Sequence, residues 1–452
     1  MHLTSIIDNV KLKSKELLQK KVLQNIILVS GVTLFISILG FIKETVVAAN
    51  YGLSIELDTF YVAILIPGVI NTVFLGSFKS VFIPNYINEV GKKGNIGSFQ
   101  STSLMITLVV SLFFAGISYL GTDTFLEILY PNKSLEFYNL VKLQLPILLF
   151  AIFFWGIAST LGALLNVNDE YRLSSFAGIY TPIFILIGIY FFSDQFKNTI
   201  LAWGTTLGAF ASCAYLLIVA KKKNLIVLGK PDYQNSNIKI AFKQLPAKIS
   251  SGLLTALNSV VDQFFAAQLV IGSIAALQYG LKIPAFLSGL LLVAFGNVLL
   301  PYFTKLVLSN RKLAFENLFK NLKWVFIGLV VITIFGILVS DLVVTLLYQR
   351  KEFTAEDTQV VSTIQKVFLA YIPFKITGMI MVNFATSINK NSIMAYISLV
   401  ALVLNVLLDY VFMEMYGVFG IALCTTIITV LKSMTMYWYL KRLKQENDSI
   451  TQ

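Results

Sequence analysis

Three lysines interrupt the apolar stretches of this sequence, and their chemistry needs an explanation. Lys43 and Lys375 lie deep within apolar runs, whereas Lys282 begins one and could instead reach lipid headgroups. A lysine at the centre of a bilayer costs about 2.5–3.5 kcal/mol on insertion scales, so such residues normally face a cavity or a partner. A cavity with buried cations and few acids favours an anionic substrate.

Acids and amides also fall within or beside these runs. Glu44 follows Lys43 directly, and adjacent residues of a helix point about 100° apart, which predicts that the two do not simply pair. Asp262 and Asp409 are either hydrogen-bond partners between two halves of the protein or buried for another reason. Amide side chains suited to hydroxyl groups of a substrate are Asn71, Asn258 and Asn297.

Composition identifies an integral membrane protein. Of 452 residues, 57% are hydrophobic and 13% are charged, and the mean hydropathy is +0.78; soluble domains are about 25% charged. The sequence shows no cleavable signal. Cys213 and Cys424 lie in apolar runs and His2 is the single histidine, so we expect no disulfide framework, metal centre, cofactor or catalytic triad. These observations argue against an enzyme.

Apolar runs long enough to cross a bilayer occur twelve times. The long run over 23–82 must contain two helices, because "NYGLSIELD" (Asn50–Asp58) interrupts it with turn formers and acids. The predicted spans are 23–49, 57–82, 101–121, 143–165, 176–193, 199–220, 250–271, 284–308, 323–347, 366–388, 393–413 and 418–440.

Lysine and arginine set the predicted orientation. If the N-terminus is cytoplasmic, most cations fall in cytoplasmic segments, as the positive-inside rule requires. We therefore predict a multi-pass protein of the bacterial cytoplasmic membrane with both termini inside. The net charge of +12 then reflects topology and contact with anionic membrane lipids rather than nucleic-acid binding.

Two similar stretches indicate a duplicated chain. "IPGVINTVFLGSFKSVFIP" (Ile66–Pro84) and "IPAFLSGLLLVAFGNVLLP" (Ile283–Pro301) share the spacing of their prolines, and "LAWGTT" (Leu201–Thr206) resembles "IALCTT" (Ile421–Thr426). Six spans in each half predict an all-α protein of two parallel-repeat lobes around a central cavity. The predicted organisation is a tail over 1–22, an N-lobe over 23–221, a basic cytoplasmic linker over 222–248, a C-lobe over 249–441 and a tail over 442–452.

Proline explains why these two helices are unusual. A proline inside a helix removes a backbone donor and kinks or starts the helix. In lipid the freed carbonyl needs another partner, so the second and eighth spans are expected to line the space between the lobes. Alternatively, Pro67 and Pro284 simply begin their helices near the membrane interface.

Several of these stretches together resemble the MurJ/MviN family of lipid II flippases. They are "LGFIKETVVAANYG", "LDTFYVAILIP" and "FKSVFIPNY" within Leu39–Tyr86, "YGLKIPAFLSGLLLVAFGNVLLPYFTKL" (Tyr279–Leu306) and "LLYQRKEFTAEDT" (Leu346–Thr358). The resemblance covers nearly the whole chain. It implies a fold of the multidrug/oligosaccharidyl-lipid/polysaccharide exporter superfamily and a transporter that moves a lipid-linked saccharide.

The chain departs from the family pattern at cationic positions. The resemblance implies cavity arginines where this chain has Ser37, Lys43 and Lys282, and paired arginines where it has Asn71–Thr72. Lysine offers a point charge where arginine offers a bidentate fork for diphosphate. Typical members also continue with two helices beyond the twelfth span.

The resemblance implies a monomeric flippase that carries a polyprenyl-diphosphate-linked saccharide, such as lipid II or a surface-polysaccharide precursor, to the outer leaflet. Lys43 and Lys282 would attract the diphosphate, with Lys375 in reserve, Asn71 would contact the saccharide, and Asp58 would organise the outer ends of the first two spans. Alternatives are an ion-coupled exporter of small cationic compounds and a non-transporting scaffold for polysaccharide synthesis. Since buried lysines outnumber any dedicated acid pair, we expect membrane voltage rather than a coupled ion to drive the cycle.

Overall fold

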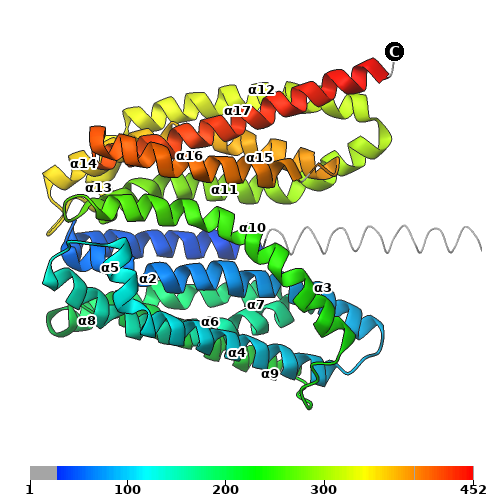
Figure 1. The fold of residues 1–452 in the computed structure, drawn as a ribbon, viewed down its shortest axis with the longest axis horizontal. Coiled ribbons are helices and arrows are strands. Elements are labelled where there is room, and N and C mark those ends of the chain that lie inside the picture. Colours follow the sequence, from blue (N-terminus) through cyan, green and yellow to red (C-terminus); the bar gives the residue numbers. More distant parts are fainter. Residues whose placement is uncertain (1–27, 391, 451–452) are drawn as a thin grey trace, which may run out of the picture.

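The computed structural model describes residues 28–390 and 392–450, and every regular element in this part of the chain is a helix. The helices form two lobes that lie one above the other in Figure 1. The lower N-lobe contains the helix Leu28–Tyr51, α2 (Ile55–Val69), a π-helical turn η1 (Ile70–Leu75), α3 (Gly76–Gly91), α4 (Ile96–Leu120), α5 (Thr122–Leu129), α6 (Leu135–Val167), α7 (Tyr171–Phe176), a 3-10 turn η2 (Ala177–Ile179), α8 (Tyr180–Phe196) and α9 (Ile200–Lys222).

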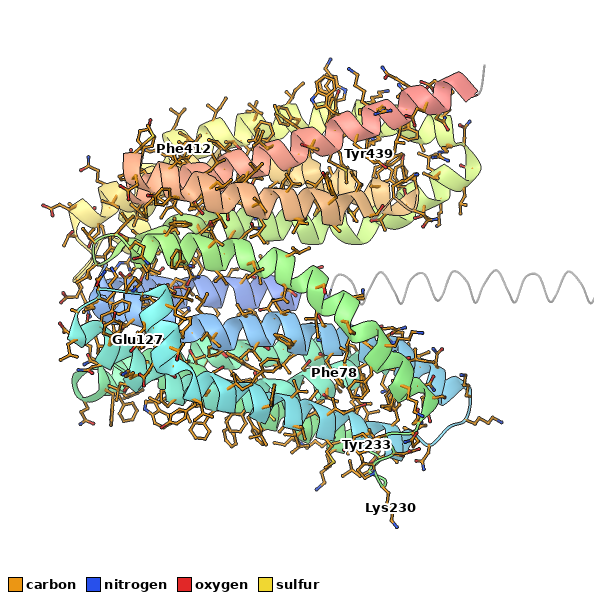
Figure 2. The ribbon with its side chains drawn as sticks, viewed as in Figure 1. Phe78, Glu127, Lys230, Tyr233, Phe412 and Tyr439 are labelled. Atoms are coloured by element: carbon orange, nitrogen blue, oxygen red, sulfur yellow. The ribbon has the colours of Figure 1, made fainter. Side chains whose placement is uncertain are left out.

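The upper C-lobe is built from the second half of the chain (Figure 1). Its helices are α10 (Ser236–Ala267), α11 (Ser273–Ser309), α12 (Arg311–Leu338), α13 (Ser340–Tyr348), α14 (Ala355–Leu369), α15 (Ile372–Ser387), α16 (Ser392–Tyr416) and α17 (Val418–Ile450). Glu127 of α5 lies in the left part of the molecule in Figure 2, and Lys230 of the segment between the lobes lies toward the right. Following the predicted orientation, we call the Glu127 end the outer end and the Lys230 end the inner end.

Eleven helices of the described residues are long and apolar enough to cross a membrane, which confirms an all-helical polytopic protein. The twelfth predicted span, 250–271, falls on α10, which is helical but less apolar because it carries Asn258, Asp262 and Gln263 in its second half. The predicted tail over 1–22 lies outside the described residues. The predicted tail over 442–452 is instead helical as far as Ile450, as a continuation of α17.

Local chemistry explains where the helices begin and bend. Gly52 adopts φ +54°, which breaks the first long apolar run, and the Ser54 hydroxyl then accepts a hydrogen bond from the Leu57 amide to start α2. Pro67 lies inside α2, and η1 begins three residues later, at Ile70. Single π-helical turns of this kind are common at functional sites.

The two lobes repeat the same helix pairings. In the N-lobe α6 packs against α2, α4 and α9, and α8 packs against α9; in the C-lobe the α14–α15 pair packs against α11, α12 and α17, and α16 packs against α17. Thr206 donates a hydrogen bond to the Ile147 carbonyl over 2.8 Å, and Thr426 donates to the Val367 carbonyl over 3.0 Å. Both bonds start at the last threonine of the repeated "LAWGTT" and "IALCTT" stretches and support the duplication.

The helix α10 connects the lobes. It begins at Ser236, within the segment that the sequence predicts as a linker, and runs diagonally from α3 to the C-lobe (Figure 1). At the inner end, the Glu89 carboxylate of α3 accepts hydrogen bonds from Asn235 over 2.9 Å and Asn237 over 2.5 Å. The first half of α10 is therefore tied to the N-lobe, whereas its second half packs against α16.

Candidate functional site

Lys43 and Lys282 line one cavity between the lobes. Lys43 comes from the first helix of the N-lobe and Lys282 from α11 of the C-lobe, and the cavity has a volume of about 310 Å³. Phe41 and Phe286 also line it and meet across the lobes with ring centroids 5.9 Å apart. The structure thus brings together the two lysines that the sequence places far apart, and adds an aromatic contact beside them.

Glu44 holds the two ammonium groups close to each other. Its Oε1 atom accepts from Lys43 Nζ over 2.5 Å and from Lys282 Nζ over 2.7 Å. The expectation that Lys43 and Glu44 do not pair is therefore wrong, because their long side chains bend back and meet despite the angle between adjacent helical positions. Glu44 is 7% exposed, and it forms an ion pair across the lobes with Lys282. One carboxylate offsets only one of the two cations, so the cavity retains a positive charge.

Asp58 joins the lobes at the outer end. Its carboxylate accepts hydrogen bonds from the amides of Gly272 over 2.7 Å and Ala275 over 2.8 Å, at the N-terminus of α11. A carboxylate in this position satisfies free amides and interacts favourably with the helix dipole. Asp58 therefore connects α2 to α11. Its role in organising the outer ends of the first two spans stays a prediction.

Backbone contacts complete this outer seal. Gly272 adopts φ +90°, and a Cβ atom there would lie 2.6 Å from the Leu53 carbonyl oxygen, so this close approach requires glycine. The Glu352 amide donates to the Ala49 carbonyl over 3.2 Å. Lys133 donates to the Leu269 carbonyl over 3.1 Å, and burial lowers the pKa of Lys133 although the nearby Asp58 opposes this change.

The other predicted site residues lie elsewhere. Asn71 is half-buried in η1, and its neighbour Thr72 lines a second cavity of about 420 Å³ together with Gln263 and Gln278. This cavity lies between α2 and the helices α10 and α11, in agreement with a kinked second span that faces the space between the lobes. The side chain of Asn297 lies outside the described residues.

Lys375 is exposed on α15, apart from the Lys43 cavity. Its Nζ atom lies 3.4 Å from the Tyr371 hydroxyl and 4.9 Å from the centroid of the Tyr371 ring. Its position therefore gives no support to a direct role beside Lys43.

A buried acid pair lies inside the C-lobe. Asn405 donates to Asp262 over 3.3 Å and to Asp409 over 3.0 Å, and Thr425 donates to Asp262 over 2.9 Å. Both acids thus belong to one lobe, so the expectation that they bond between the lobes is wrong. Oδ1 of Asp409 and Oδ1 of Asn405 are buried without a hydrogen-bond partner among the described residues.

This arrangement suits a small cation. Two ionised carboxylates that share one amide donor repel each other in a buried site, so a proton or a metal ion stabilises the pair. The oxygens of Asp262, Asn405, Asp409 and Thr425 are hard donors of the type that alkali and alkaline-earth ions prefer. Sequence reasoning identified the two acids but not their partners, Asn405 on the helix of Asp409 and Thr425 on the next helix, both far from Asp262 in the chain.

Known proteins identify the family. The sequence matches the family described as "Lipid II flippase MurJ" over residues 47–451. The chain belongs to the MurJ lipid II flippase family. It is 24% identical over 430 residues to a "Probable lipid II flippase MurJ" of Buchnera aphidicola subsp. Baizongia pistaciae, covering 92% of this chain and 83% of that protein. A protein of the same description from Vibrio cholerae is 24% identical over 445 residues, covering 92% and 82%.

Solved structures show the same fold. A structure titled "Lipid II flippase MurJ, inward closed conformation" has a TM-score of 0.79 and 22% identity, covering 92% of this chain and 87% of that one. An inward-facing multidrug resistance MATE family transporter of the MOP superfamily has a TM-score of 0.74 and 12% identity, covering 93% and 99%. The chain is therefore a multi-pass membrane transporter of the MurJ family and not an enzyme, and the predicted family and fold class are confirmed.

Proposed function

We propose that the protein flips a polyprenyl-diphosphate-linked saccharide, with lipid II as the first candidate, from the inner to the outer leaflet. The observation that carries this proposal is the cavity in which Lys43 and Lys282, from different lobes, are held together by Glu44. Charge-assisted hydrogen bonds to a diphosphate are among the stronger polar interactions in proteins. The relatives that match this chain over most of its length bear the name of lipid II flippases, which supports this cargo.

The diphosphate would compete with Glu44 for the two lysines. As it binds, the carboxylate of Glu44 loses its bond to Lys282, and an ion pair that connects the lobes is replaced by one that includes the substrate. The saccharide would occupy the cavity while the polyprenyl chain stays in the bilayer. Binding energy thereby becomes available to shift the equilibrium between two arrangements of the lobes.

Release at the outer leaflet requires the seal around Asp58 to open. Its two bonds to the N-terminus of α11 and the contact of Gly272 with Leu53 close the outer end. The cycle therefore alternates between breaking this seal and re-forming it. In this scheme the chain acts as a monomer with both termini in the cytoplasm.

The acid pair of the C-lobe favours a cation as the coupling partner. The expectation of voltage drive rests on an excess of buried lysines over any dedicated acid pair, and the Asp262–Asn405–Asp409 cluster is such a pair. Sodium ions or protons bound there would act on α10, which carries Asp262 and also contacts the N-lobe. Ion coupling is therefore the stronger candidate.

The test replaces the lysines in vesicles that contain purified protein and fluorescent lipid II. Lys43→Ala and Lys282→Ala should each lower the flipping rate roughly ten- to hundredfold, because each removes a charge-assisted bond of about 1.5–3 kcal/mol. Lys43→Arg should retain activity because arginine supplies two donors. Lys142→Ala, at an exposed lysine paired with Asp123, is the control. Unchanged flipping by both alanine variants would contradict the proposal.

A further inference from the structure

A second hollow lies on the C-lobe, between α12, α15 and α17. Its volume is about 600 Å³, within the range of about 300–1,000 Å³ that is typical of ligand sites. It has no lining residue in common with the Lys43 cavity. We call it the C-lobe groove; aromatic side chains and one cation dominate its lining, namely Phe319, Lys323, Phe326, Phe374, Tyr437 and Trp438.

The groove runs along the helices rather than across them. Phe319 and Tyr437 pair at one end with ring centroids 5.4 Å apart, and Phe326 and Phe374 pair at the other end at 5.2 Å. The first pair lies nearer the start of α12 and the end of α17, which is the inner end of the molecule (Figure 1). The groove therefore extends from the level of the inner headgroups toward the middle of the bilayer, which is the direction of a lipid acyl chain.

Three lysines surround the inner end of the groove. Lys323 lines it, the Lys441 ammonium lies 5.1 Å from the ring centroid of Trp438, and the Lys444 ammonium lies 5.9 Å from that of Phe319. The nearby Arg442 is paired with Glu446 over 3.1 Å, so its charge is offset. Cations therefore gather where the phosphate of a lipid would lie, and apolar rings where its chain would lie.

We propose that the C-lobe groove binds an anionic phospholipid of the inner leaflet. One acyl chain runs from Trp438 at the inner end toward Phe326 and Phe374. The phosphate contacts Lys323, Lys441 and Lys444. A zwitterionic lipid fits the apolar part equally well but gains less from the cations, so the site prefers lipids with net negative charge. This site is independent of the proposed flipping site, and its failure would leave that proposal standing.

Tryptophan fluorescence provides the test. Trp438 lines the groove, whereas Trp324 follows Lys323 on α12 and does not; their exposed fractions are similar, 62% and 66%. Two single-tryptophan proteins, one retaining each residue, are placed in phosphatidylcholine vesicles that contain a few per cent of lipid brominated on its acyl chains. Brominated phosphatidylglycerol should quench the fluorescence of Trp438 more strongly than its fraction of the total lipid predicts. The quenching of Trp324 should match that fraction. Brominated phosphatidylcholine should quench both in proportion.

Charge variants complete the design. Each lysine near the inner surface contributes roughly fivefold to the preference for anionic lipid, so replacement of Lys323, Lys441 and Lys444 by glutamine should remove the extra quenching of Trp438. Replacement by arginine should preserve it. Equal quenching of the two tryptophans by phosphatidylglycerol, or a preference that survives the triple glutamine variant, would overturn the proposal. Relief of quenching by polyprenyl phosphate, but not by unlabelled phosphatidylglycerol, would also overturn it and assign the groove to the substrate tail.

Discussion

Glu44 changes the interpretation of the cavity, because its carboxylate pairs with both lysines that line it. It neutralises one of two lysines that would otherwise repel each other, and it lies between the lobes. Glu44→Gln should therefore lower the thermal stability of the protein, since breaking a buried ion pair costs about 3–5 kcal/mol. A short-chain polyprenyl diphosphate should restore more stability to the variant than to the parent, because the anion replaces the lost charge.

Thermal unfolding in detergent, with and without the diphosphate, measures both effects. Glu56→Gln is a suitable control, because Glu56 lies 3.9 Å from Lys197 at the outer end and outside the cavity. If Glu44→Gln unfolds at the parent temperature and gains no more from the diphosphate, Glu44 is not the group that the substrate displaces.

The sequence predicts single residues well where their type alone is unusual. Lys43 and Lys282 stand out because a lysine in an apolar run is costly, and both reach the same cavity. The bond between Lys43 and Glu44 was missed because helix geometry fixes the direction of Cβ, whereas several rotatable bonds decide where the charged ends lie. The sequence did not indicate that Asn405 and Thr425 bond to the acid pair, because a polar residue in an apolar span has many possible partners.

Contact between α2 and α11 closes the outer end, and it depends on one carboxylate. Asp58→Asn replaces an acceptor oxygen with an amide that cannot accept from both Gly272 and Ala275. Loss of such a cap costs about 0.5–2 kcal/mol, which should increase the population open to the outside severalfold. A cysteine at Gln278, which lines the second cavity between α2, α10 and α11, should then react faster with an impermeant maleimide added outside.

The labelling is done in a background without the two native cysteines. Replacing Glu56, two residues earlier on the same helix, should leave the rate unchanged. A rate for Asp58→Asn equal to that of the parent would show that the backbone contacts of Gly272 suffice to hold the seal.

Membrane-spanning helices could be predicted from the sequence wherever a long apolar run marks them. All twelve spans could be found in this way, although the run on α10 is less apolar than the other eleven because polar residues interrupt it. Its earlier start at Ser236 has a local cap, because the Asn235 side chain accepts hydrogen bonds from the amides of Asn237 and Ile238. The bond from Asn237 to Glu89 adds a contact between distant segments, which cannot be predicted from local sequence. A local cap and a tertiary contact therefore act together at this boundary.

If the two lobes arose by duplication, hydrogen bonds at corresponding positions of the lobes should contribute similar amounts to stability. Thr206→Val and Thr426→Val each remove a hydroxyl that bonds a carbonyl of a neighbouring helix. Hydrogen bonds between membrane helices contribute about 0.6–1.7 kcal/mol, so each change should lower stability by a similar amount. Thr→Ser at either position keeps the donor and should change little. Unfolding in detergent measures this stability. If one valine variant is much less stable than the parent and the other is as stable as the parent, the two bonds are not equivalent.

In the proposed cycle, the two lobes, the cavity between them and the acid pair together decide which gradient drives transport. Asp262 lies on α10, which contacts both lobes, so a cation held between Asp262 and Asp409 can influence the arrangement of the whole molecule. Lys43 and Lys282 lie in the cavity between the lobes, where the proposed diphosphate would bind. Ion coupling therefore predicts that Asp409→Asn removes the dependence of flipping on a cation gradient but preserves binding of the diphosphate.

Vesicles with an imposed potassium-diffusion potential and separate sodium and proton gradients distinguish the two driving forces. The parent protein should follow one cation gradient and continue to do so when the potential is held at zero. Asp409→Asn should flip at the same slow rate with or without that gradient, while its thermal stabilisation by a short-chain diphosphate remains that of the parent. If the parent instead follows the sign of the potential and ignores both gradients, the buried lysines provide the coupling charge. The acid pair would then serve only to pack α10 against α16 and α17.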